Sequence, residues 1–301
     1  MQEILKAEGL KKYFGKVKAV DGVDFSVSQG GLVALLGQNG AGKSTTINII
    51  CTLLKKDAGC VRVCGADVDL QPDEVRANIG VVFQGSIMDR TLSVSDNLLL
   101  RAGFYGLNGT QARERLKNLD GMLDLKEIFS RQYGKLSGGQ RRRIGVARAL
   151  ALDPKLVVCD EPVSALDVSI QAQILNLMRE LQRKYQLTYI FISHNLSVVK
   201  HICDRIAVMY LGNIVEIAPK KELFDNPLHP YTKALLGAIP IPDPDIPAMQ
   251  DMLEGDVPSP INPPKGCCFH TRCHGCCKEC TAQKPKLINV GNDHWVACCK
   301  V

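Results

Sequence analysis

The feature that most constrains the fold is a glycine-rich segment, Gly37-Gln-Asn-Gly-Ala-Gly-Lys43-Ser44, which directly follows the apolar run Leu32–Leu36. It matches the pattern G-x-x-x-x-G-K-[ST], and helix-forming residues follow it. Glycines allow successive backbone N–H groups to point at phosphate oxygens, and a helix N-terminus adds the positive end of its dipole. Lys43 supplies a positive charge for the β- and γ-phosphates, and the Ser44 hydroxyl can ligate Mg²⁺. Because strand and helix patterns flank the segment, we interpret it as a nucleoside triphosphate site and not as a chance glycine turn.

Strand and helix patterns alternate from Leu5 to about Val215, which is typical of an α/β fold. Apolar, β-branched runs predict strands at Leu32–Leu36, Ile79–Phe83, Leu156–Cys159, Thr188–Ile192 and Arg205–Met209. The predicted helices are Lys43–Leu54, Gly138–Leu152, Val168–Lys184 and Leu196–His201. Between Gln84 and Leu136 the apolar residues Leu116, Leu119, Leu123 and Ile128 keep helical spacing, so we expect a mostly helical insertion there.

A second buried-strand pattern, Leu156–Cys159, ends in the two carboxylates Asp160 and Glu161. Next to a phosphate-binding loop, Asp160 would hold Mg²⁺ directly or through water, and Glu161 would activate or orient the attacking water. Alone, an apolar strand that ends in Asp-Glu is most often structural. Only its combination with the glycine-rich segment favours the catalytic interpretation.

The pentapeptide Leu136-Ser-Gly-Gly-Gln140 lies between these two motifs and is followed by the basic run Arg141–Arg143. It is the signature of ATP-binding cassette (ABC) proteins, and the segment from Leu5 to about Leu236 resembles an ABC nucleotide-binding domain, with a mixed sheet core and a helical subdomain. In that family two cassettes face each other head to tail around two ATP molecules. The resemblance implies that Ser137, Gly138, Gly139 and Gln140 contact the ATP held by the partner. A plainer alternative is a glycine turn with Ser137 as a helix N-cap, and both can hold.

The resemblance also implies roles for residues outside these motifs. Gln84 matches the family's Q-loop residue, His194 the switch histidine, and Ser164–Asp167 the D-loop that touches the other cassette. Phe14 falls where the family stacks an aromatic ring on adenine, although the adjacent Tyr13 could do the same. The expected catalytic residues are Glu161, His194 and Gln84, with Ser44, Gln84 and Asp160 on Mg²⁺. The expected nucleotide contacts in this chain's own loop are Gly37, Gln38, Asn39, Gly40, Ala41, Gly42, Lys43, Ser44 and Thr45.

Several stretches of the second half resemble the ATPases of peptide and nickel importers. They include Glu161–Asn176, Tyr189–Leu196, Asn226–Leu236 and Glu254–Cys267. The resemblance implies import of oligopeptides, dipeptides or nickel chelates, with two transmembrane permease subunits, an extracytoplasmic binding protein and a second, paralogous cassette as partners. The stretch Val82–Leu98 looks more like cassettes of drug and polysaccharide exporters, so an exporter is the alternative.

Cysteine is the unusual residue of this chain: eight of its 13 cysteines fall in the last 35 residues. Four of them, Cys267, Cys273, Cys280 and Cys298, match positions that in some members of the subfamily hold a [4Fe–4S] cluster. Four thiolates also suit zinc, and the pairs Cys273-x-x-Cys276 and Cys277-x-x-Cys280 have zinc-like spacing. Reduced thiols or disulfides are the remaining alternative. We expect the five other cysteines, Cys51, Cys60, Cys64, Cys159 and Cys203, to behave as small core residues.

The expected organisation is a nucleotide-binding domain over residues 1–238, with its helical subdomain at about 85–150, then a Pro-rich linker over 239–264 and a Cys-rich metal-binding extension over 265–301 that forms a separate small unit. The start lacks a signal-peptide pattern and no apolar run is long enough to span a bilayer. We therefore expect a peripheral protein at the cytoplasmic face of the membrane. The net charge of +6 is weak support for any polyanionic partner, and we expect no nucleic acid. A redox- or iron-sensing ATPase is a further alternative.

Overall fold

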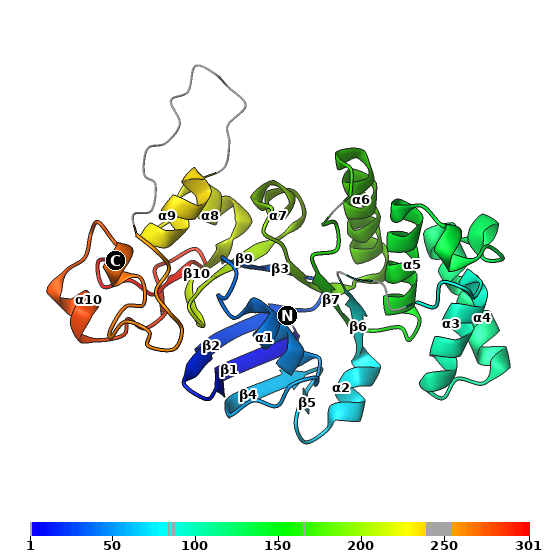
Figure 1. The fold of residues 1–301 in the computed structure, drawn as a ribbon, viewed down its shortest axis with the longest axis horizontal. Helices are drawn as coiled ribbons and strands as arrows, with labels where there is room; N and C mark the ends of the chain where they lie inside the picture. The colour runs from blue at the N-terminus through cyan, green and yellow to red at the C-terminus, as the bar shows by residue number, and fades with distance from the viewer. Residues whose placement is uncertain (1, 84, 86–87, 165, 239–254) are drawn as a thin grey trace, which may run out of the picture. The chain divides into compact units, whose positions relative to one another are not determined.

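The computed structural model describes residues 2–83, 85, 88–164, 166–238 and 255–301. The chain divides into two compact units, which are described separately below. Figure 1 shows the fold of the described residues as a ribbon. Unit 1 comprises Met1–Leu5, Val27–Gly31 and Arg62–Ile192, and unit 2 comprises Lys6–Ser26, Leu32–Val61 and Ser193–Val301.

The sheet of unit 2 contains the strand that leads into the glycine-rich segment and two strands from later in the chain. Strand β3 (Leu32–Leu36) is buried along its whole length and pairs in parallel with β9 (Arg205–Tyr210). Strand β10 (Asn213–Pro219) returns antiparallel to β9, with a register shift between Ile214 and Glu216. Both sequence-predicted strands of this unit are therefore confirmed, and the run of apolar residues in β3 is explained by burial on both faces.

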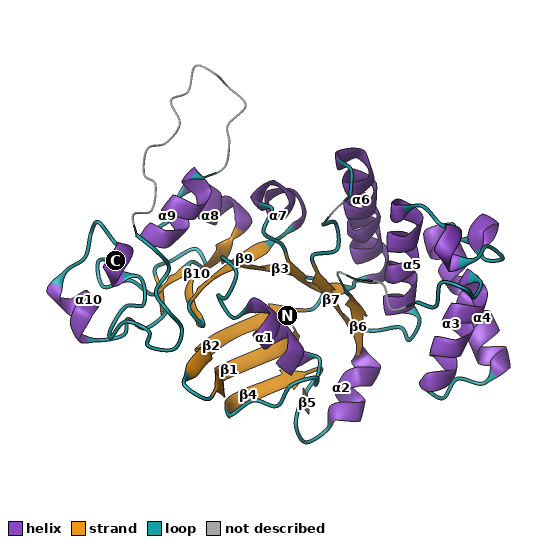
Figure 2. Cartoon of the chain, in the orientation of Figure 1, coloured by secondary structure: helices purple, strands orange, loops and turns teal. Residues whose placement is uncertain are grey.

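The C-terminal extension continues the sheet of unit 2. Strand β12 (Trp295–Val296) pairs antiparallel with β10 and also with β11 (Ile288–Asn289). The extension is therefore not the separate small unit that its composition suggested, because its backbone bonds extend the same sheet. The helices of unit 2 are α1 (Lys43–Ile50), α7 (Leu196–Ile202), α8 (Lys220–Asp225), α9 (Pro230–Gly237) and α10 (Lys278–Ala282), shown in Figure 2.

Unit 1 holds three parallel strands, β6 (Ile79–Val82), β7 (Leu156–Asp160) and β8 (Thr188–Ile192), which pair in the order β8-β7-β6. These match the predicted strands to within one residue at either end. Its helices are α2 (Pro72–Asn78), α3 (Val94–Phe104), α4 (Gly109–Leu123), α5 (Gly138–Leu150) and α6 (Val168–Tyr185). Helices α3 and α4 confirm a helical insertion, although Ile128 lies in a short 3₁₀ turn and not in a helix.

Four further strands form a second sheet in the order β2-β1-β4-β5. The sequence patterns did not predict them, because charged residues interrupt the apolar alternation of β1 and β2. No helix in the described part of the chain is both long and apolar enough to cross a membrane. The bounds of these strands are Glu3–Phe14 for β1, Val17–Ser28 for β2, Ala58–Val63 for β4 and Ala66–Asp67 for β5.

Candidate functional site

The glycine-rich segment adopts a backbone path in unit 2 that only glycine can follow at two points. Gly37 has a φ of 152°, and a Cβ atom there would lie 2.3 Å from the carbonyl oxygen of Met209. Gly42 has a φ of 102°, and a Cβ atom there would lie 2.5 Å from the carbonyl oxygen of Ala19. Both residues combine left-handed backbone with close contact to another backbone segment. The loop is therefore fixed at both ends by neighbouring strands.

Lys43 begins helix α1 and points back across this loop. Its Nζ atom donates hydrogen bonds to the carbonyl oxygens of Gly37 at 2.6 Å and Gln38 at 2.9 Å. The lysine is buried, whereas Asn39, Gly40 and Ser44 are exposed. The loop therefore presents backbone N–H groups and a hydroxyl to solvent with an ammonium group behind them, which is an arrangement suited to an anion.

The backbone of Gln38 is also held from the C-terminal region. Its N–H group donates to the phenolic oxygen of Tyr231, in helix α9, at 3.1 Å. Tyr231 is fully buried, and burial raises its pKa to about 12, so the hydroxyl is neutral at physiological pH. Nothing in the sequence singled out Tyr231 as a site residue, because 193 residues separate it from Gln38.

The two aromatic candidates for adenine differ in their surroundings. The hydroxyl of Tyr13 donates to Asp21 Oδ1 at 2.6 Å, and burial together with this bond raises the Tyr13 pKa to about 12. Phe14 is 48% exposed at the end of β1, with Lys12 Nζ 5.6 Å from the centre of its ring. The exposed ring of Phe14 therefore suits stacking better than the constrained ring of Tyr13. His194 is exposed shortly before α7.

The carboxylates of unit 1 lie at the carboxyl end of β7. Asp160 is the last residue of this otherwise buried strand, and both it and Glu161 are partly exposed. Glu161 has a φ of 47°, and its N–H group donates to the carbonyl oxygen of Ile192 at 3.0 Å. Its own carbonyl oxygen accepts from the N–H group of Ser164 at 3.2 Å and from the Ser164 hydroxyl at 2.9 Å. A left-handed non-glycine residue held by such bonds at a strand end is typical of a functional turn.

Ser137 caps the N-terminus of helix α5. Its hydroxyl oxygen accepts from the Gln140 N–H group at 3.3 Å, and the Gln140 side chain accepts from the Ser137 N–H group at 3.1 Å. This reciprocal capping box confirms the plainer interpretation of Ser137. Ser137 and Gly138 are nevertheless exposed, so the helix start remains accessible to a ligand from outside the chain.

Two arginines of α5 form hydrogen bonds to strand β6 and to the residue that follows it. Arg142 donates to the carbonyl oxygen of Phe83 at 2.8 Å, and Arg148 donates to that of Val81 at 2.8 Å. Burial lowers the pKa of Arg148 to about 10, which leaves it charged at pH 7. The basic run after the signature is thus partly structural, a role that the sequence did not reveal. Gln84, the next residue after Phe83, lies outside the described residues.

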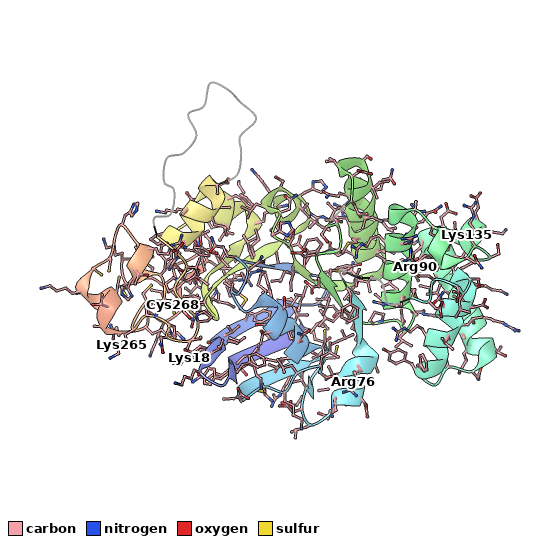
Figure 3. All side chains as sticks on the ribbon, in the orientation of Figure 1. Lys18, Arg76, Arg90, Lys135, Lys265 and Cys268 are labelled. Atoms are coloured by element: carbon pink, nitrogen blue, oxygen red, sulfur yellow. The ribbon has the colours of Figure 1, made fainter. Side chains whose placement is uncertain are left out.

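The cysteines of the extension do not form the predicted metal site. The described chain, which includes all eight of these cysteines, has no group of three or more His, Cys, Asp or Glu side chains arranged to hold a metal ion. The sulfur atoms of Cys277 and Cys280 lie 3.2 Å apart, and Cys268 accepts a hydrogen bond from Asn213 Nδ2 at 3.1 Å; Figure 3 labels Cys268. The expected ligand set Cys267, Cys273, Cys280 and Cys298 is therefore not found as a metal-binding group among the described residues.

The five cysteines elsewhere only partly follow the expectation of core residues. Cys51, Cys159 and Cys203 are buried, whereas Cys60 and Cys64 are partly exposed. Burial raises the pKa of the Cys159 thiol well above its usual value, so this thiol stays protonated.

Comparisons with known proteins agree with the geometry of both units. The family model "ABC transporter" matches residues 20–164, and the model "Oligopeptide/dipeptide transporter, C-terminal region" matches residues 215–280. The oligopeptide transport ATP-binding protein AppF of Bacillus subtilis (strain 168) is 44% identical over 319 residues, covering 99% of this chain and 97% of that protein. OppF of Escherichia coli (strain K12), with the same description, is 45% identical over 298 residues, covering 95% and 88%. A nucleotide-free ATP-binding cassette from an ABC transporter superimposes with a TM-score of 0.70 at 32% identity, covering 78% of this chain and 98% of that one.

Proposed function

Because the chain belongs to the ABC transporter family and carries the oligopeptide/dipeptide transporter C-terminal region, we propose that it is the ATP-hydrolysing subunit that energises oligopeptide import. The observation that carries this proposal is 44% identity to an oligopeptide transport ATP-binding protein along 99% of the chain. As a member of the ABC ATP-binding cassette family, the chain is an ATPase.

The described loop residues fit a triphosphate and its Mg²⁺ ion. The exposed turn at Asn39 and Gly40 offers backbone N–H groups, and the exposed Ser44 hydroxyl is a ligand of the type that Mg²⁺ prefers. Lys43 would exchange its bonds to the loop carbonyls for bonds to the β- and γ-phosphates. Mg²⁺, when bound, would neutralise part of the phosphate charge. We propose that Gly37–Thr45 bind the phosphates and that Phe14 stacks on the adenine.

The carboxylates of β7 supply the groups that hydrolysis needs. Asp160 would serve as a Mg²⁺ ligand, and Glu161 would orient the attacking water and take its proton. The hydrogen bonds of the Glu161 backbone support this role, because they fix the position from which its side chain extends. We propose supporting roles for Gln84 and His194, as the sequence motifs predicted.

The exposed start of helix α5 supports a role in trans. We propose that Ser137, Gly138, Gly139 and Gln140 contact ATP bound by a second cassette, which is a paralogue of this chain. Two permease subunits and an extracytoplasmic binding protein complete the proposed transporter, and the chain would act at the cytoplasmic face of the membrane. No described helix is able to span the membrane, so attachment would depend on these partners.

Uptake measurements test this proposal in the cell. A strain lacking the gene is assayed for uptake of a labelled oligopeptide, a labelled dipeptide and ⁶³Ni²⁺, and for retention of an exported drug. Loss of oligopeptide uptake that wild-type protein restores, but Lys43→Ala does not, is the expected result. Loss of dipeptide or nickel uptake alone would change the substrate class, and increased drug retention with normal uptake would support the exporter alternative instead.

The iron–sulfur cluster rests on the sequence resemblance alone. The described residues show no group arranged to hold a metal ion, so we assign the cluster no role in ATP hydrolysis. Iron and zinc content of anaerobically purified protein, with the visible absorbance of a cluster, tests this hypothesis. A chain that contains neither metal leaves reduced thiols or disulfides as the state of the extension.

A further inference from the structure

The hydroxyl of Tyr231 joins the C-terminal region to the phosphate-binding loop. The Gln38 N–H group donates to Tyr231 Oη at 3.1 Å, and the Gln38 carbonyl oxygen accepts from Lys43 Nζ at 2.9 Å. The two polar groups of this residue's backbone are thus fixed from opposite directions, one by α9 and one by the phosphate-binding lysine. A shift of Tyr231 would therefore move the loop at the point where it leaves β3.

Tyr231 itself has little freedom to move. Its ring lies 4.7 Å from that of Tyr210 in β9 and 5.5 Å from that of Phe269 in the extension, measured between ring centres. The rings of Tyr210 and Phe269 meet edge to face at 5.3 Å. All three side chains are at most 1% exposed. Packed aromatic clusters of this kind hold a defined geometry, so the extension helps to set the position of the Tyr231 hydroxyl.

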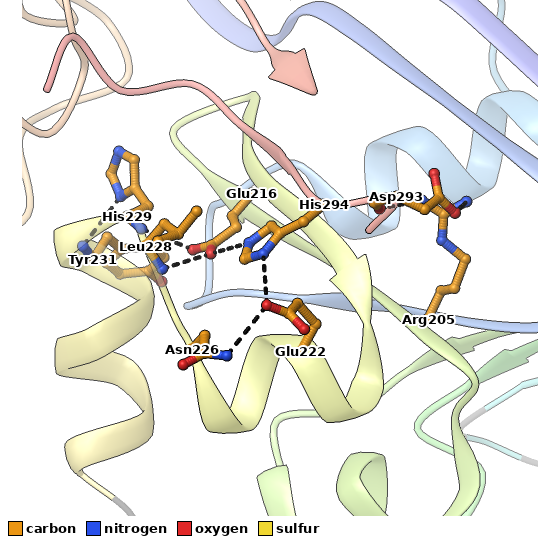
Figure 4. A network of polar contacts seen from close by, with 9 residues as sticks. All are labelled: Arg205, Glu216, Glu222, Asn226, Leu228, His229, Tyr231, Asp293 and His294. Atoms are coloured by element: carbon orange, nitrogen blue, oxygen red, sulfur yellow. Dashed lines mark hydrogen bonds and ion pairs between the residues drawn. The ribbon is translucent and has the colours of Figure 1, made fainter. Parts of the chain in front are cut away.

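The start of helix α9 is anchored by a buried carboxylate, shown in Figure 4. Glu216 in β10 is fully buried and accepts from the N–H groups of Leu228 at 2.8 Å and His229 at 3.0 Å. His294 of the extension donates to the same carboxylate from Nε2 at 2.7 Å. His229 Nδ1 then accepts from the Tyr231 N–H group at 3.1 Å. A continuous set of contacts thus leads from the extension through Glu216 to Tyr231 and the loop.

We propose that Tyr231 is a positioning residue for ATP binding, through which the C-terminal region holds the phosphate-binding loop in its binding geometry. The buried Tyr231 hydroxyl accepts from the Gln38 N–H group and fixes its direction before ATP binds. Because the loop is already ordered before ATP binds, less conformational entropy is lost on binding and the affinity is higher. The inference rests on the proposed function only in taking the ligand of this loop to be ATP.

The test compares Tyr231→Phe with the wild-type full chain. Phenylalanine keeps the ring packing and removes only the bond to Gln38. We expect the Kd for ATP, measured by calorimetric titration, to rise about three- to tenfold, the range expected from one lost neutral hydrogen bond. In the assembled transporter, KM for ATP should rise in proportion, with kcat nearly unchanged. The matched control is Tyr189→Phe, which removes a buried hydroxyl with no hydrogen-bond partner among the described residues.

Each outcome decides the inference. An unchanged Kd for Tyr231→Phe, or an equal rise for Tyr189→Phe, overturns it. If Tyr231→Phe does not fold, Glu216→Gln is used for the test. The two carboxylate oxygens of Glu216 accept from two backbone N–H groups and from His294, whereas the amide of glutamine has only one acceptor oxygen. The Gln38 amide should then exchange with deuterium faster and the Kd for ATP should rise, and no change in either would overturn the inference. Failure of the wild-type chain to bind ATP would instead refute the proposed function.

Discussion

The ammonium nitrogen of Lys43 donates a hydrogen bond to the carbonyl oxygen of Gly37 at 2.6 Å, so the phosphate-binding loop itself fixes the position of this side chain. We expect Lys43→Ala to weaken ATP binding at least tenfold, because charge-assisted hydrogen bonds to the phosphates are lost. Calorimetric titration of the full chain measures this directly. Lys117→Ala, at an exposed position in α4, is the control and should bind ATP as the wild type does. Equal affinity of Lys43→Ala and wild type would contradict the assignment of the loop.

Glu161 provides the test of the catalytic step. Glu161→Gln keeps the size and the backbone bonds of this residue but removes its capacity to accept a proton. We expect turnover in the assembled transporter to fall about a hundredfold or more while ATP still binds. Steady-state hydrolysis and ATP binding are measured on the same samples, with Glu127→Gln at an exposed site as control. Hydrolysis by Glu161→Gln at the wild-type rate would show that another group acts as the base.

Gly80 in β6 is expected to be essential for packing against α5. A Cβ atom at Gly80 would lie 2.2 Å from the carbonyl oxygen of Ala149 and 3.0 Å from Pro154 Cγ. Gly80→Ala should therefore lower the free energy of unfolding by about 1–3 kcal/mol, since backbone must shift to make room. Gly145→Ala in α5 is the matched control: nothing lies within 4 Å of its added Cβ, and alanine should stabilise the helix by about 0.5–1 kcal/mol. Urea unfolding of both variants checks the opposite signs.

The buried His229 side chain should make the protein less stable at acidic pH. Burial lowers its pKa to about 4 from the usual 6.5, and its Nδ1 atom must remain unprotonated to accept from the Tyr231 N–H group. The unfolded chain therefore binds a proton below pH 6.5 that the folded chain does not bind until about pH 4. The contribution of neutral His229 to the free energy of unfolding is complete above pH 6.5. It declines as the pH falls to 4, by about 3 kcal/mol in total.

The control for this pH dependence is His229→Asn, because asparagine can cap α9 but does not titrate. Unfolding free energies at pH 7 and pH 5 are compared for both proteins. The wild type should lose more stability than the variant over this interval. Parallel losses would show that His229 titrates normally in the folded chain.

The sequence predicted what depends on local pattern. The strand, loop and helix around Lys43 and the buried strand before Asp160 follow from apolar runs and glycine spacing. These elements were correct, except that α1 ends at Ile50 and not at Leu54, because Thr52 adopts a left-handed backbone. The contact of Tyr231 with Gln38 and the burial of Glu216 depend on pairings between distant segments, which no local pattern encodes. The strands β1 and β2 escaped prediction because charged residues interrupt their apolar alternation. The cysteine cluster shows the opposite problem, because close spacing in sequence predicted a metal site, whereas the described residues contain no group of side chains arranged to hold a metal ion.

Strand β12 pairs with the outer edge of β10, and this pairing affects the solubility of the protein. A chain cut before residue 288 would leave the backbone of β10 unpaired along its outer side, at apolar residues that include Ile217. Bare strand edges of this kind recruit other chains and lead to insoluble material. Strand β12 thus protects this edge of the sheet, so truncation before it would lower solubility even where every ATP-binding motif is kept.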